Sequence, residues 1–278
     1  MQGWVVGCRT IQALKERNET LIKGNKMFIK LENLNVHYKV AGAGAPVILL
    51  HGWGCNIDYF AKLQAYLAKK FTVYAIDLPG FGLSTTPEKI WGSAEYANLI
   101  EQFINDLKIV NPILLGHSLG GKIIINLVAH GLVEIKKIIL ISSSGIQLPK
   151  SLKTKVRIYF FKLLKFLVKL PIIKIILGPR MELYRKKFGS NDYKNASGIM
   201  REILVKTVNE NVITLLPKIK IPVLLLWGDQ DTMTTAGAGQ IMQLAILGSK
   251  LKIFTGSGHF PFLDNWEKVA MELDNFLG

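Results

Sequence analysis

Residues 113–121 read Ile-Leu-Leu-Gly-His-Ser-Leu-Gly-Gly. The three large apolar residues at the start predict a short strand that is buried on both faces. Residues 119–130 predict a helix, and the five residues 116–120 between strand and helix fit the pattern G-x-S-x-G. Where a strand turns sharply into a helix, this pattern exposes the serine hydroxyl, and the glycines remove side chains that would clash. Ser118 is therefore the candidate nucleophile.

Apolar strands and helices alternate on both sides of this turn. Eight strands are predicted, at residues 27–31, 34–40, 47–50, 72–76, 113–115, 138–141, 223–226 and 251–254. The first two alternate like an antiparallel hairpin, whereas the later ones are mostly continuous apolar runs. Helices are predicted at residues 59–70, 93–107 (capped by Ser93), 119–130, 240–247 and 266–277. The fold class is therefore α/β, with a mostly parallel eight-stranded sheet and helices on both faces.

The composition is that of an ordinary globular protein. The chain has 278 residues, of which 49% are hydrophobic and 20% are charged, which excludes wholesale disorder and coiled coil. Its two cysteines, Cys8 and Cys55, are too few for a disulfide framework, and no Cys/His cluster predicts a zinc site. We therefore expect no metal and a reducing compartment, the cytoplasm.

The positive charge is concentrated in one part of the chain. The formal net charge is +15, and residues 150–187 alone hold twelve Lys or Arg residues with one acid, Glu182. Residues 146–215 contain no signal of a buried strand. We interpret 146–215 as a helical, basic cap inserted into an α/β core of residues 27–145 and 216–278, after an N-terminal extension of residues 1–26.

Two interpretations of the basic cap stay open. Lys155, Lys162, Lys165 and Lys169 share one stripe of a predicted helix whose remainder is mostly apolar. The cap could cover the active site with its lysines in water, or it could contact an anionic membrane surface. Nucleic acid is not expected as a partner, because no nucleic-acid-binding motif accompanies the charge. An apolar cap favours a hydrophobic substrate.

No segment predicts a membrane span or a secretory signal. The most apolar stretch, residues 160–177, is interrupted by lysines and by Pro171, so it falls short of about 18 uninterrupted apolar residues. Residues 5–8 faintly resemble a lipoprotein cleavage site, but the positive flank and the long apolar run are missing. Residues 1–26 could form a short amphipathic helix, a frayed tail or an upstream start.

Four motifs, taken together and in order, resemble those of the α/β-hydrolase superfamily. They are His51-Gly52-Trp53-Gly54, the segment Asp77 to Ser84 (DLPGFGLS), the turn around Ser118, and the pair Trp227–Asp231 with Ser257–Pro261. The resemblance covers residues 27–278 and implies a hydrolase core with a helical cap. It is specific to the superfamily and names no single substrate.

The resemblance implies a catalytic triad of Ser118, Asp231 and His259. His259 follows the last strand in a glycine-rich loop, as the family's base does. Asp231 fits the family spacing from Gly228, although Asp229 follows the same strand and could instead stabilise the loop. Glycines soon after Asp231 suggest a loose loop behind the acid.

The other histidines are given structural roles: His37 lies in the hairpin, His130 ends a helix, His117 points elsewhere on the turn, and His51 holds the loop that follows it. The backbone N–H groups of Trp53 and Leu119 are the candidate oxyanion hole. The Trp53 ring could also line the acyl pocket or pack in the core.

These residues predict a serine hydrolase that cleaves carboxylic esters, with short to medium acyl chains or lactones, through an acyl-enzyme intermediate. No cofactor is expected, and the partner is a small hydrophobic ester. Alternatives on the same triad are other acyl or carbon–carbon bond hydrolysis and peracid formation. A non-catalytic scaffold that binds a ligand in the capped pocket is a further alternative.

Overall fold

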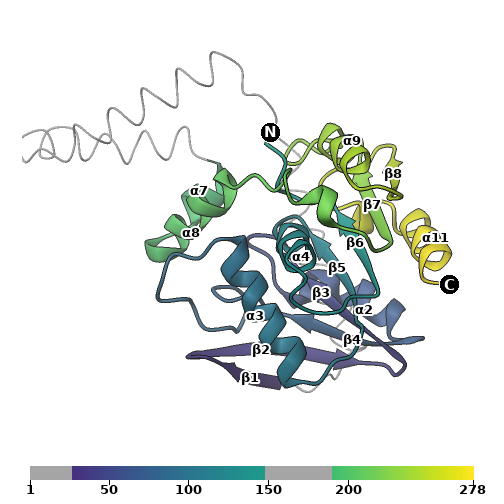
Figure 1. The fold of residues 1–278 in the computed structure, drawn as a ribbon. Coiled ribbons are helices and arrows are strands. Elements are labelled where there is room, and N and C mark those ends of the chain that lie inside the picture. The colour runs from purple at the N-terminus through teal and green to yellow at the C-terminus, as the bar shows by residue number, and fades with distance from the viewer. Residues whose placement is uncertain (1–26, 148–189) are drawn as a thin grey trace, which may run out of the picture.

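The computed structural model describes residues 27–147 and 190–278, and the predicted fold class is confirmed (Figure 1). One eight-stranded sheet has the order β1-β2-β4-β3-β5-β6-β7-β8. Its strands are β1 (Met27–Leu31), β2 (Leu34–Ala41), β3 (Ala45–Leu50), β4 (Phe71–Ile76), β5 (Ile113–His117), β6 (Lys137–Ile141), β7 (Val223–Gly228) and β8 (Lys250–Phe254). β2 runs antiparallel to β1 and β4, and every other neighbouring pair is parallel.

Helices cover both faces of the sheet. They are η1 (Ile57–Phe60), α2 (Ala61–Leu67), α3 (Ser93–Asp106), α4 (Leu119–Ala129), α7 (Asn191–Asn195), α8 (Gly198–Asn209), η2 (Leu216–Lys218), α9 (Ala236–Ala245), α10 (Pro261–Asp264) and α11 (Trp266–Leu277). One apolar cluster joins the sheet to α3, α4, α8 and α9, and a second joins it to η1, α2, α10 and α11.

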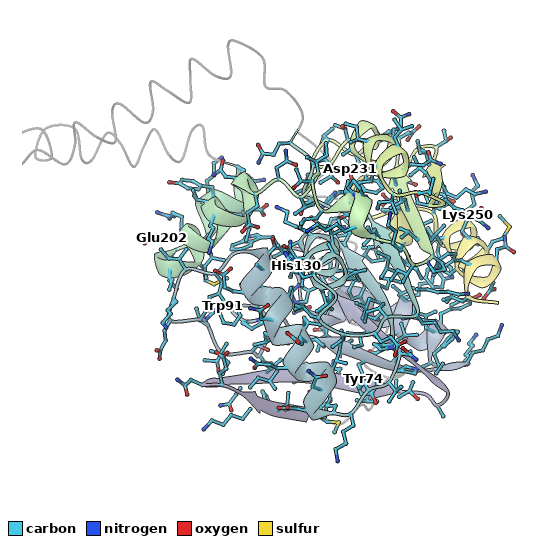
Figure 2. The ribbon with its side chains drawn as sticks, viewed as in Figure 1. Tyr74, Trp91, His130, Glu202, Asp231 and Lys250 are labelled. Carbon is cyan, nitrogen blue, oxygen red and sulfur yellow. The ribbon has the colours of Figure 1, made fainter. Side chains whose placement is uncertain are left out.

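Alternation along the strands supplies both clusters. Leu114 of β5 belongs to the first cluster, while its neighbours Ile113 and Leu115 belong to the second. Successive side chains of a strand point to opposite faces, so an apolar run is needed wherever both faces are covered. Side chains fill the space between the sheet and its helices (Figure 2).

Element boundaries differ from the predictions in two informative places. Ser93 is the first residue of α3 and not its cap, which is Gly92. The Ser93 hydroxyl instead donates to Glu210, 2.6 Å away. Helix α9 begins at Ala236, so Gly237 and Gly239 lie inside a helix that was predicted to start only at residue 240.

The described part of the predicted cap consists of α7 and α8, which lie between β6 and β7 in the chain. The basic stretch 150–187 falls wholly in 148–189, and the extension 1–26 precedes β1; both lie outside the described residues. The division into extension, core and cap therefore stays a prediction. Across residues 27–147 and 190–278, no helix has the length and apolar character needed to cross a membrane.

Candidate active site

Ser118 stands at a strained turn between β5 and α4. Its backbone has φ 51° and ψ −109°, a conformation that costs energy for a residue with a side chain. Its N–H is held by the Ile141 carbonyl at 3.0 Å. A Cβ at residue 116 would lie 2.5 Å from the Gly120 backbone, and a Cβ at residue 120 would lie 2.0 Å from the Leu50 carbonyl oxygen. The glycines are thus required by close backbone contacts.

A cavity of about 720 Å³ opens over this turn. Ser118 and His259 both line it, together with Trp53 and Leu119. Its remaining wall comes partly from the described part of the predicted cap, including Met200 of α8. The sequence-predicted nucleophile, base and oxyanion donors therefore surround one cavity.

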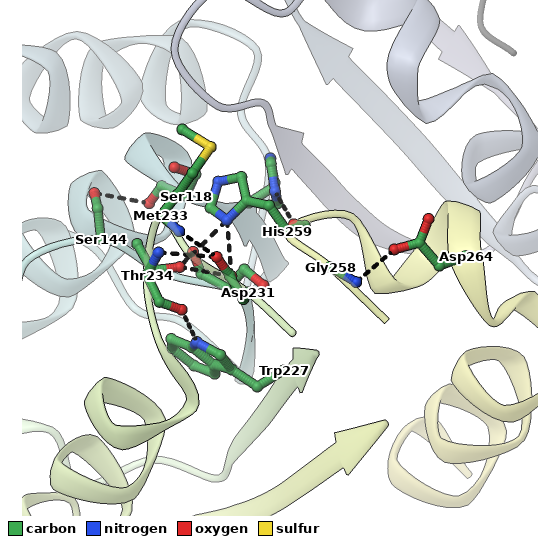
Figure 3. Close-up of polar contacts among 11 residues, drawn as sticks. Ser118, Ser144, Trp227, Asp231, Met233, Thr234, Gly258, His259 and Asp264 are labelled. Carbon is green, nitrogen blue, oxygen red and sulfur yellow. Dashed lines mark hydrogen bonds and ion pairs between the residues drawn. The ribbon is translucent and has the colours of Figure 1, made fainter. Parts of the chain in front are cut away.

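Asp231 and His259 form a buried pair (Figure 3). Oδ2 of Asp231 lies 2.8 Å from Nδ1 of His259, and their side chains are 0% and 8% exposed. Oδ1 accepts the N–H groups of Met233 and Thr234, each at 2.9 Å. Burial raises the pKa of Asp231, but the hydrogen bond and charge of His259 and these N–H groups outweigh it, so that the pKa lies below its ordinary value. The carboxylate stays ionised.

The loop behind the acid is firmly held, contrary to the expectation of a loose loop. The Trp227 indole N–H donates to the Thr234 carbonyl at 2.7 Å. The Thr234 hydroxyl lies 2.9 Å from both Asp231 Oδ2 and the Ser142 carbonyl. Gly239 packs against the Trp227 ring, where a Cβ would lie 2.9 Å away, so this glycine tightens the packing of α9.

The alternative acid, Asp229, points elsewhere. It is exposed, and its Oδ1 accepts the Gly256 N–H at 2.8 Å. That contact closes the turn after β8. The structure therefore brings Asp231, and not Asp229, to the imidazole of His259.

His117 has a positioning role that the sequence analysis missed. Its Nε2 lies 2.8 Å from the backbone carbonyl of His259. A carbonyl only accepts, so Nε2 carries the proton. Burial and the nearby His259 hold the pKa of His117 well below its ordinary value, which keeps the ring neutral. The ring thereby fixes the loop that carries the candidate base.

His51 holds the neighbouring loop, as the sequence predicted. Its Nδ1 donates to the Gly52 carbonyl at 2.7 Å, and its Nε2 accepts the Leu78 N–H at 3.0 Å. A Cβ on Gly52 would lie 3.1 Å from Cβ of Ser118. The loop backbone thus lies directly against the serine.

The two predicted oxyanion donors are unengaged within the described structure. The N–H of Trp53 follows Gly52, and the N–H of Leu119 is the first of α4. Neither has an acceptor among residues 27–147 and 190–278, as is usual for the first N–H groups of a helix. The Trp53 ring both lines the cavity and packs edge-on against Phe81, with centroids 4.9 Å apart.

Asp77, in the DLPGFGLS segment, braces this region. Its carboxylate accepts from His37 Nδ1 at 2.7 Å, from the Ile57 N–H at 2.8 Å and from the Leu83 N–H at 2.9 Å. One buried carboxylate therefore ties the hairpin, the oxyanion loop and its own loop together. Sequence reasoning recognised the motif without finding this role.

Comparison with known proteins agrees with this architecture. The sequence model of the alpha/beta hydrolase fold matches residues 45–265. The chain belongs to the α/β-hydrolase family. It is 27% identical over 253 residues to a pimeloyl-[acyl-carrier protein] methyl ester esterase of Legionella pneumophila, covering 88% of this chain and 100% of the relative.

Two solved structures are similar to this α/β hydrolase over most of their length. An esterase of Exiguobacterium antarcticum has a TM-score of 0.71 and 25% identity, covering 90% of this chain and 98% of the other. A bacterial membrane phospholipase A has a TM-score of 0.75 and 24% identity, covering 98% and 91%. Esterases thus recur among the similar proteins.

The described part of this hydrolase contains no group of three or more His, Cys, Asp or Glu side chains arranged to hold a metal ion. Around the cavity lie a serine at a strained apex, an imidazole paired with a buried carboxylate, and two N–H groups that have no acceptor in the described part of the chain. Such a set suits acyl transfer, because each charge that develops has a facing partner.

Proposed function

We propose that this α/β hydrolase cleaves carboxylic esters through an acyl-enzyme, with Ser118 as nucleophile, His259 as base and Asp231 as the acid that orients it. The observation that carries the proposal is the 2.8 Å contact of Asp231 with His259 on the wall of the cavity that Ser118 also lines. Esterase activity in related proteins supports it.

The chemistry follows from the protonation states. Nδ1 of His259 donates to Asp231, which leaves Nε2 free to take the Ser118 proton. Oγ of Ser118 bonds to the ester carbonyl carbon, and the N–H groups of Trp53 and Leu119 stabilise the oxyanion. His259 gives the proton to the leaving alcohol, and a water molecule activated by His259 then releases the acid.

Hydrolysis of nitrophenyl acetate, butyrate and octanoate tests the proposal. The Ser118→Ala variant is expected to lose at least about 10³-fold in kcat/KM. Ser249→Ala is the matched control, because Ser249 lies outside the cavity and bonds to the Gln243 carbonyl. Activity that survives in Ser118→Ala contradicts the proposed nucleophile, and inactivity towards a broad ester and lactone panel favours a ligand-binding scaffold.

We also propose that the basic stretch 150–187 contacts anionic membrane surfaces, since it combines twelve cationic residues with one acid in an otherwise apolar sequence. Co-sedimentation with phosphatidylcholine vesicles, with and without phosphatidylglycerol, tests this. Binding that requires the anionic lipid, and that falls when Lys155, Lys162, Lys165 and Lys169 are replaced by glutamine, supports the contact. Equal recovery with both vesicles contradicts it. Location in the cytoplasm and the exclusion of nucleic acid stay predictions.

A further inference from the structure

Lys122 is a buried cation on the wall of the active-site cavity. It lies on α4 four residues after Ser118, which is about one helical turn, or ~6 Å, along the helix axis. The residue is only 2% exposed, yet it lines the same cavity as Ser118. A buried ammonium is costly unless it is paired and hydrogen-bonded.

The described contacts of Lys122 leave part of its ammonium group unsatisfied. Nζ donates to the Thr207 carbonyl in the last turn of α8, and this is its one acceptor within the described ranges. An ammonium has three donors. Glu210, whose charge acts on Lys122, accepts hydrogen bonds elsewhere: its carboxylate lies 3.1 Å from the Ser93 N–H and 2.6 Å from the Ser93 hydroxyl.

The cavity wall carries an acidic side chain, Asp192, and a basic side chain, Lys122. Asp192 lies on the side of the oxyanion loop, where its Oδ1 would be 4.0 Å from a Cβ on Gly54. Asp192 offers a substrate anion no positive charge on that side, although burial raises its pKa and so disfavours its ionised form. Lys122 presents the opposite charge from α4, and apolar side chains such as Met200 and Leu204 also line the cavity.

We propose that Lys122 determines specificity by binding a carboxylate at the far end of the acyl group, so that the preferred substrate is a monoester of a dicarboxylic acid. This rests on the proposed ester hydrolysis. A ligand carboxylate would accept from the ammonium donors that the Thr207 carbonyl leaves free and would form an ion pair with Lys122, and charge-assisted hydrogen bonds are roughly twice as strong as neutral ones. The alkyl chain between the two ends would contact the apolar wall.

The charge of Lys122 is sensitive to pH near neutrality. Burial lowers its pKa and Glu210 raises it, with a result of about 8. The ammonium is therefore charged below pH 8 and loses its charge as the pH rises through that value. The other titratable groups on the cavity wall are Cys55, Tyr59, His117, Asp192, Glu210 and His259. A ratio of two substrates cancels the effect of these groups on the chemical step that both esters share, and the Lys122→Met variant separates Lys122 from the other charges.

The test compares the nitrophenyl monoester of adipic acid with nitrophenyl hexanoate, which has the same number of acyl carbons. The adipate-to-hexanoate ratio of kcat/KM is expected to fall about 10- to 100-fold in Lys122→Met. The Lys122→Arg variant keeps the positive charge and is expected to retain much of the wild-type ratio. Lys206→Met is the control, because Lys206 pairs with Glu95 at 2.7 Å and lies outside the cavity. It should leave the ratio unchanged.

An equal loss on both esters in Lys122→Met means that Lys122 only fixes α8 to α4, and this overturns the inference. The wild-type protein gives a second test that needs no variant: its adipate-to-hexanoate ratio should fall between pH 7 and pH 9, and a flat or rising ratio overturns the inference. If neither ester is hydrolysed and Ser118 reacts with no fluorophosphonate, the proposed function itself has failed.

Discussion

Oδ2 of Asp231 lies 2.8 Å from Nδ1 of His259, although 28 residues separate them in the chain. The carboxylate is itself fixed by N–H groups from Met233 and Thr234. A carboxylate held in this way sets the tautomer and the direction of the imidazole, and it stabilises the imidazolium that forms during acyl transfer. Substitution of Asp231 therefore tests the roles of both residues.

Asp231→Asn should lower kcat by about 10³- to 10⁴-fold, because the amide favours the wrong tautomer of His259 while the fold stays intact. Asp229→Asn is the matched control. Its carboxylate bonds to the Gly256 N–H and is exposed, so its kcat should change by less than about 3-fold, as expected for a surface substitution. Initial rates with a nitrophenyl ester measure both. Equal losses in the two variants would contradict the assignment.

The low pKa of Asp231 should also make folding stability depend on pH. Its folded pKa lies below the ordinary value of 3.8, so the ionised form stabilises the fold above about pH 4, and this contribution is lost as the pH falls through the folded pKa. Urea unfolding of wild type and Asp231→Asn at pH 7 and pH 3 measures it. The difference in free energy of unfolding should shrink at pH 3. An unchanged difference would show that the charge of Asp231 does not stabilise the fold.

Gly120→Ala should destabilise the protein by about 1–3 kcal/mol or more, because the new methyl group would lie 2.0 Å from the Leu50 carbonyl oxygen. Gly237→Ala is the control within α9, where the nearest heavy atom to a Cβ would be 3.7 Å away. That variant should be neutral or gain up to about 1 kcal/mol from helix propensity. Thermal unfolding distinguishes them, and a neutral Gly120→Ala would contradict the close contact.

His117→Phe should lower kcat by about 10-fold with little change in KM, because the His259 carbonyl loses its hydrogen-bond donor. His117→Gln can still donate and should recover much of the loss. A purely structural role of the ring would instead show as a fall in thermal stability that accounts for the activity of both variants. Steady-state kinetics with one ester, together with melting temperatures, tests this.

The sheet could be predicted because buried parallel strands need continuous apolar runs. The prediction for residues 223–226 falls inside β7 (Val223–Gly228), and helix α11 was predicted with the boundaries Trp266–Leu277 that it has. Helix starts were harder, since Ser93 is an attractive cap by residue type, but the capping position belongs to Gly92. The Ser93 hydroxyl instead bonds to Glu210, 117 residues further along the chain, and no local pattern encodes that contact.

The site was predictable where local geometry dictates the residues, as at Ser118 between its glycines. It was not predictable where a side-chain direction decides the role. The role of His117 depends on the direction of its ring, which the strained turn points to the loop that carries His259. The residue pattern around Ser118 does not specify that direction. Lys122 would ordinarily be read as a surface lysine on an amphipathic helix, but α4 is covered on nearly all sides and buries it.

Reaction with a fluorophosphonate probe, followed by peptide mass mapping, tests the central claim most directly. The account predicts one equivalent of adduct per chain, located on Ser118, with no adduct in Ser118→Ala and slower labelling in Asp231→Asn. Labelling of another residue, or an adduct that persists in Ser118→Ala, would contradict it.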